Sequence, residues 1–150
     1  MNLVTSYKKV TAKLKNGGFL PLLAIRLILA YGFYEPAKMK LKDVQGIADW
    51  FGSMGYPFPL LNAYLATATE TAGVVLLILG LGTRIISIPL MVIMLVAIFT
   101  VHISNGFAAG DNGFEIPLYY LVMLFTLFIF GSGKASVDYL IHKKRRNTAA

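Results

Sequence analysis

Two charged residues lie within stretches that are otherwise apolar enough to be membrane helices. Glu70 lies in LATATETAGVVLLILGLG, and Arg26 interrupts an earlier apolar stretch. Placing an ionised side chain near the centre of a bilayer costs at least about 2.5 to 3.5 kcal/mol, so such residues usually have a partner or a task. We predict that Arg26 and Glu70 pair inside the membrane. The pair would either join two helices or form the charged floor of a ligand cavity.

A second polar group is expected at the outer side of the membrane. His102 lies 18 residues past Arg84, about 27 Å along a helix, and Asn105 follows one turn later. Glu115 opens the last apolar segment from the same side, and Glu35 ends the first. We predict that these side chains converge at one depth as ligand-binding residues. His102 and Glu115 are the candidate catalytic residues, because a histidine beside a carboxylate can exchange protons near neutral pH. The alternatives for His102 are a hydrogen-bonded role between helices and metal binding.

The composition indicates a membrane protein. The chain has 150 residues, of which 57% are hydrophobic and 14% charged, whereas about 25% of a soluble domain is charged. Four apolar segments, at about 19–36, 60–81, 85–103 and 116–130, predict an all-α, four-helix membrane bundle that forms a single domain over 1–150. Basic tails are expected at 1–18 and 134–150.

The cofactors that the chain could hold are limited by its composition. It has no cysteine, so it cannot supply thiolate ligands for an iron–sulfur cluster or other metal site. A haem between two histidines of this chain is not expected, because the second histidine, His142, lies in the C-terminal tail on the opposite side of the membrane from His102. No resident metal site is predicted.

The distribution of basic residues predicts the orientation. Ten Lys and Arg residues fall on the side of the two tails and three in the loops on the other side. The positive-inside rule therefore places both termini in the cytoplasm. We expect the KKRR run at 143–146 to contact anionic lipid rather than nucleic acid.

The first outer loop predicts a short amphipathic helix. Apolar residues recur at helical spacing between Val44 and Met54, and charged residues fall between them. Aromatic residues would anchor this helix at the membrane surface: Trp50, Phe51, Tyr56 and Phe58. The helix would either cover the His102 group or rest on lipid.

Several motifs, in order along the chain, resemble the DoxX family. They are RLILAYGF, MGYPFP, ATETAG, LLILGLGTR, TVHISNGF, GFEIPL and GSGKASVD. The run from LPLLNAYLATATE to TVHISNGF further resembles DoxX members that accompany the biosynthesis of small copper-handling peptides. The resemblance implies a four-helix protein of the bacterial inner membrane. It also implies that Arg26, Glu70, His102 and Glu115 match the polar pattern of the family.

The resemblance leaves three functions open. The family is similar to the membrane subunit of a thiosulfate:quinone oxidoreductase, and other members are linked to thiol redox and oxidative stress. The first hypothesis is a redox-linked membrane subunit with a polar cavity for a quinone-like ligand, in which electrons would need quinone or an external cofactor. The second is a non-catalytic anchor or assembly factor for a membrane or periplasmic protein partner. The third is a small transporter, which would require a homo-oligomer.

Overall fold

The predicted all-α bundle is confirmed. The structure is a computed structural model that describes residues 17–148, and within this range it contains helices and no strand. Nearly all of the predicted N-terminal tail therefore lies outside the described residues. Three helices are long and apolar enough to cross a membrane: α2 (Phe19–Lys42), α4 (Pro59–Leu79), and α5 (Thr83–Ala97) with its extension to Asn105. A fourth apolar helix, α6 (Glu115–Phe130), has 16 residues.

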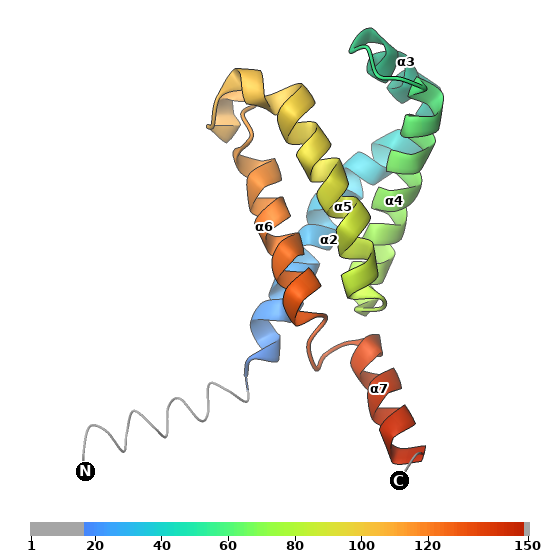
Figure 1. Cartoon of the computed structure of the whole chain (residues 1–150), viewed down its shortest axis with the longest axis vertical. Helices are drawn as coiled ribbons and strands as arrows, with labels where there is room; N and C mark the ends of the chain where they lie inside the picture. The colour runs from blue at the N-terminus through green and yellow to red at the C-terminus, as the bar shows by residue number, and fades with distance from the viewer. Residues whose placement is uncertain (1–16, 149–150) are drawn as a thin grey trace, which may run out of the picture.

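The helices form a bundle with two different ends (Figure 1). α4, α5 and α6 run beside one another, and α2 crosses behind them at an angle. The helix α3 (Val44–Ser53) lies at one end, together with the loop that joins α5 to α6. The helix α7 (Val137–Thr148) leaves the bundle at the other end. We call these the α3 end and the α7 end.

The first membrane helix is longer than the apolar pattern predicts. The apolar run ends at Pro36, but α2 continues through this proline to Lys42. The residues after Pro36, AKMKLK, are mostly strong helix formers, which favours continuation of the helix. Asp43 then ends α2 and begins α3, because its carboxylate accepts a hydrogen bond from the backbone N–H of Gly46 at 2.8 Å. Lys40 thus belongs to a helix rather than to a loop.

The short helix predicted in the first loop is confirmed as α3. It packs against α4 and buries Ala48, while Phe51 contacts the rings of both Trp50 and Tyr56. At the same end of the bundle, α5 changes into a π-helical turn over Ile98–His102, which the sequence pattern does not predict. Such turns are rare and frequently occur at functional sites.

Close helix contacts at glycines hold the bundle together. A Cβ at Gly32 of α2 would lie 1.8 Å from the hydroxyl oxygen of Tyr120 on α6. A Cβ at Gly73 of α4 would lie 2.9 Å from Leu90 on α5. Small residues allow this approach, which favours helix association in a membrane. The fully buried core side chains include Leu29, Leu77, Leu90, Leu124 and Leu127.

Candidate functional site

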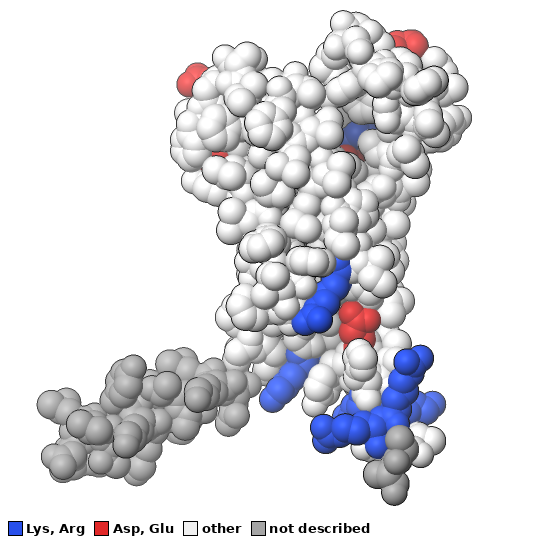
Figure 2. Space-filling model, viewed as in Figure 1, with Lys and Arg blue, Asp and Glu red and all other residues white. Residues whose placement is uncertain are grey.

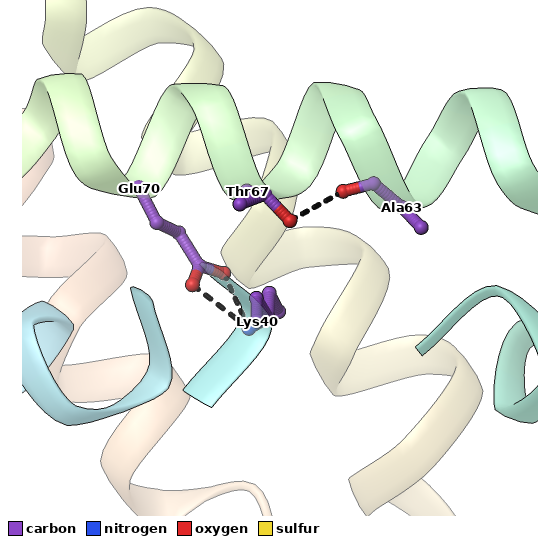
Figure 3. Close-up of polar contacts among 4 residues, drawn as sticks. All are labelled: Lys40, Ala63, Thr67 and Glu70. Atoms are coloured by element: carbon purple, nitrogen blue, oxygen red, sulfur yellow. Dashed lines mark hydrogen bonds and ion pairs between the residues drawn. The ribbon is translucent and has the colours of Figure 1, made fainter. Parts of the chain in front are cut away.

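Glu70 lies about midway along α4 and faces the bundle. It is 11 residues from Pro59, about 16 Å along the helix. Its buried face also carries Ala63, Thr67 and Gly73, as the helical spacing predicts. The prediction that Glu70 pairs with Arg26 is wrong. The ammonium group of Lys40 donates hydrogen bonds to both oxygens of the Glu70 carboxylate, at 2.8 and 3.0 Å (Figure 3).

The Lys40–Glu70 ion pair is largely buried, but Lys40 remains partly accessible. The side chain of Glu70 is 4% exposed and that of Lys40 is 14% exposed. Figure 2 shows basic and acidic atoms within a recess near the α3 end. Because a single unpaired charge at this depth would be strongly unfavourable, each group compensates the charge of the other. An ammonium and a carboxylate side by side can donate to, and accept from, a polar headgroup of a ligand.

Arg26 instead binds the chain just beyond the end of α6. Its Nη1 donates to the carbonyl oxygen of Ser132 at 3.0 Å, and its Nη2 to that of Ala135 at 2.9 Å. Helix α6 ends at Phe130, about 24 Å from its start, so the following carbonyls need donors at a depth where water is scarce. Arg84 also donates to this end, from Nη2 to the carbonyl oxygen of Ile129 at 3.0 Å. Both arginines thus stabilise the C-terminal end of a short helix.

Asp138 completes this polar contact at the α7 end. Its carboxylate accepts hydrogen bonds from the backbone N–H groups of Gly82 at 2.9 Å and Thr83 at 3.3 Å, at the start of α5. Its own N–H donates to the carbonyl oxygen of Gly80 at 3.1 Å. A Cβ at Gly80 would lie 1.9 Å from Nη1 of Arg26. We call the group of residues joined by these contacts the α7-end clamp: Arg26, Gly80, Gly82, Thr83, Ser132, Ala135 and Asp138.

Sequence reasoning missed Asp138, although one signal was present. It is the single acidic residue after Glu115, within a segment rich in Lys and Arg. An isolated acid in a basic tail is a candidate for a specific contact rather than for solubility alone. The GSGKASVD motif therefore has a structural explanation, since it supplies the acceptors for Arg26 and the cap for α5.

The predicted polar group at the α3 end is partly assembled. His102 Nδ1 lies 2.7 Å from the carbonyl oxygen of Asn112, and the amide nitrogen of Asn105 donates to the same oxygen at 3.2 Å. Because a carbonyl oxygen can only accept, Nδ1 of His102 carries the hydrogen. In the neutral ring, Nε2 is then the nitrogen with a free lone pair.

The two carboxylates predicted for this group have other partners. Glu115 accepts hydrogen bonds from the N–H of Ala109 and the hydroxyl of Tyr119, both at 2.9 Å, which ties the α5–α6 loop to the start of α6. Glu35 forms an exposed ion pair with Lys38 at 3.4 Å. Within residues 17–148, no group of three or more His, Asp or Glu side chains is arranged to hold a metal ion.

A hydrogen bond between loops connects the two parts of the α3 end. The hydroxyl group of Tyr56, in the loop from α3 to α4, bonds with that of Thr100 in the π-helical turn. The hydroxyl of Thr100 donates to the carbonyl oxygen of Val96, so the hydroxyl of Tyr56 is the donor to Thr100. Sequence reasoning assigned Tyr56 to the membrane surface and did not find this contact.

Comparisons with known proteins agree with the architecture. The chain is 34% identical over 131 residues to an uncharacterized protein of Haemophilus influenzae, with 85% of this chain and 87% of that protein covered. It is 31% identical over 127 residues to a Bacillus subtilis protein named "Putative oxidoreductase CatD", with 83% and 90% covered. No solved structure matches. The family model described as DoxX matches residues 21–103, which include Arg26, Lys40, Glu70 and His102. The chain therefore belongs to the DoxX family, as its motifs predicted.

Proposed function

We propose that this chain is a membrane subunit of an oxidoreductase, in which Lys40 and Glu70 form the polar end of a site for a quinone-like headgroup. The observation that carries the proposal is the ion pair itself: two ionised groups lie within the span, with Lys40 still partly exposed. Intramembrane charges are costly and are often retained for function. The name of the Bacillus subtilis relative supports a redox role.

The chemistry of the pair suits a quinone. The ammonium of Lys40 would donate a hydrogen bond to a quinone oxygen, and the carboxylate of Glu70 would accept one from a quinol hydroxyl. Interconversion of quinone and quinol takes two electrons and two protons. The chain has no cysteine, so we assign the electrons to a partner protein and proton exchange to the polar residues of this chain.

The site would face the periplasm. We place the α7 end, with its basic tail, in the cytoplasm of a bacterium and the α3 end at the outer face of the inner membrane. Lys40 is near the α3 end of α2, and His102 lies at the same end of the bundle. His102 and Glu115 would exchange protons with the periplasm, whereas Arg26 belongs to the opposite end and has no direct role in the site.

Quinone extraction tests the proposal. The protein is purified from membranes in a mild detergent, and the bound quinone is extracted and measured per chain. We expect a stoichiometric quinone in the wild type and its loss in the Glu70→Gln variant. The matched control is Glu35→Gln, which removes the carboxylate of an exposed Glu–Lys pair. A wild-type protein that carries no quinone would contradict the proposal.

A double variant separates loss of the site from loss of the fold. Lys40→Met combined with Glu70→Gln removes both charges and leaves no unpaired charge in the membrane. We expect this variant to keep its helical circular dichroism but to lose the quinone. If the double variant keeps both its circular dichroism and its quinone, the ion pair only joins α2 to α4, and the ligand site lies elsewhere.

A role as anchor or assembly factor is the second candidate. It is favoured by the aromatic side chains that are exposed at the α3 end, including Trp50, Phe58 and Phe107. Phe58 is 77% exposed and has a positive φ of 50°, a strained conformation for a non-glycine residue. A soluble protein that co-purifies equally with the wild type and with Glu70→Gln, but not with Phe58→Ser, would support this function instead of the quinone site.

A further inference from the structure

The C-terminal helix α7 lies beyond the packed bundle. It runs from Val137 to Thr148 and buries none of its residues. Figure 1 shows it leaving the bundle past the ends of α4, α5 and α6. A 12-residue helix is too short to be stable in water without contacts, so a surface that stabilises α7 is expected.

The start of α7 is fixed at the boundary of the bundle. Asp138 caps the start of α5 and donates its own N–H to Gly80, as described above. The hydroxyl of Ser136 accepts a hydrogen bond from the N–H of Tyr139 at 3.2 Å, which caps α7 itself. Because Gly80 follows the last residue of α4, the first turn of α7 lies at the depth where the membrane helices end.

The residues of α7 change from apolar to basic with distance from this point. Tyr139, Leu140 and Ile141 are exposed in the first turns. Four basic residues follow, Lys143, Lys144, Arg145 and Arg146, and all of them are exposed. In the part of the chain that the structure describes, none of the four forms an ion pair with an acid. Figure 2 shows basic atoms gathered at this end of the molecule.

This order matches the polarity of a lipid interface. Each headgroup layer is about 5 to 7.5 Å thick, since a bilayer is about 40 to 45 Å thick and its hydrocarbon core about 30 Å. Lys143 is four residues past Tyr139, about 6 Å along the helix. Apolar residues at the hydrocarbon boundary, followed by cations one headgroup layer further out, are complementary to an anionic lipid surface.

We propose that α7 binds the headgroups of anionic phospholipids in the leaflet at the α7 end. Tyr139, Leu140 and Ile141 insert at the boundary of the acyl chains, and the four basic residues contact lipid phosphates. The apolar residues favour lipid over a nucleic acid or a soluble acidic protein. Tyr139, Leu140 and Ile141 are exposed in the first turns of α7, next to the point where α4 ends, and phosphate groups alone would leave these side chains without an apolar partner. The binding does not depend on the proposed quinone site.

Competition between two lipids tests the proposal with the full chain. The detergent-purified protein is given equal amounts of phosphatidylglycerol and phosphatidylcholine, and retained lipids are counted by native mass spectrometry. We expect the wild type to retain phosphatidylglycerol preferentially. In Arg145→Gln combined with Arg146→Gln, the preference should fall about 25-fold, because each of the two removed cations contributes a factor of about five. Salt should weaken the preference of the wild type, because exposed charges are screened.

The matched control removes two cations from the other end of the bundle. Lys38→Gln combined with Lys42→Gln changes the net charge equally and should leave the lipid preference unchanged. Equal circular dichroism of all three proteins shows that α7 and the bundle are folded. An unchanged preference in the arginine variant, or an equal loss in the lysine control, would overturn the proposal. Displacement of phosphatidylglycerol by an oligonucleotide at equal phosphate concentration would overturn it in favour of a nucleic acid partner.

Discussion

Removing one partner of the Lys40–Glu70 pair should destabilise the protein strongly, and removing both should cost much less. At the shorter N–O distance of 2.8 Å, and with an effective dielectric constant of about 20, the Coulomb attraction is about 6 kcal/mol. The loss of water by both ions offsets much of this attraction. A variant that lacks one partner keeps the other charge in the membrane, and such variants typically lose about 3 to 5 kcal/mol.

The two single variants should not be equally unstable. Lys40 lies two residues before the end of α2 and is 14% exposed, so in Glu70→Gln its long side chain can turn toward water. Glu70 is 4% exposed, about 16 Å from the start of α4, and has no such route. We therefore expect Lys40→Met to be less stable than Glu70→Gln at neutral pH. Acidification should reduce the penalty of Lys40→Met, because protonation removes the unpaired charge of Glu70.

The assay is a double-mutant cycle of unfolding free energies in detergent. The wild type, Lys40→Met, Glu70→Gln and the double variant are unfolded in a denaturing detergent series and followed by circular dichroism. We expect a coupling free energy of about 2 kcal/mol or more, within the range for residues in contact. The exposed pair of Glu35 with Lys38 is the control and should couple by less than about 1 kcal/mol. Additive effects of the two buried substitutions would refute the reasoning.

Three further predictions concern the α7-end clamp. Gly80→Ala should cost about 2 kcal/mol or more of stability, because Gly80 has a φ of 65° and its new Cβ would meet Arg26. Gly55→Ala is the control, since Gly55 has a φ of 79° but open space around it, and it should cost only the strain of the positive φ. Thermal unfolding compares the two variants. Arg26→Lys should cost about 1.5 to 3 kcal/mol in the same assay, since one ammonium cannot replace both guanidinium bonds, and it should leave quinone retention unchanged. Asp138→Ala should cost about 1 kcal/mol and accelerate amide hydrogen exchange at Thr83, because the cap of α5 is lost; unchanged exchange would contradict this role.

The membrane helices were predictable because long apolar runs have few alternative structures. The predicted segment 60–81 corresponds to α4, the segment 85–103 to α5 with its extension, and the segment 116–130 to α6. The amphipathic pattern of the first loop also predicted α3. The end of α2 was not predictable from hydropathy, since the residues after Pro36 are polar enough for a loop but continue the helix.

The partners of the charged residues were harder to predict than the helices. The depths in the membrane that we estimated from residue positions allowed Arg26 to reach Glu70. Such depths do not tell which side of a helix faces which neighbour. The short length of α6 was visible in the sequence, and it places unpaired carbonyls within reach of Arg26. An arginine has five donors and suits several carbonyl acceptors, whereas a lysine is a compact charge that suits one carboxylate. These requirements explain why Arg26 binds two carbonyl oxygens and Lys40, rather than Arg26, pairs with Glu70.

The polar contacts of the two ends differ in how far they would allow the proposed ligand to bind. At the α7 end, Arg26 is 1% exposed, both of its terminal nitrogens bind carbonyls, and the turn at Gly80 has no space for even one more carbon atom. At the α3 end, Lys40 is partly exposed and His102 has one ring nitrogen outside its bond to Asn112. A ligand that needs polar partners would have to break the contacts of Arg26 at the first end, but could reach Lys40 at the second with little rearrangement. We therefore expect the double variant Lys40→Met with Glu70→Gln to lose the ligand and keep the fold, and Arg26→Lys to weaken the fold and keep the ligand.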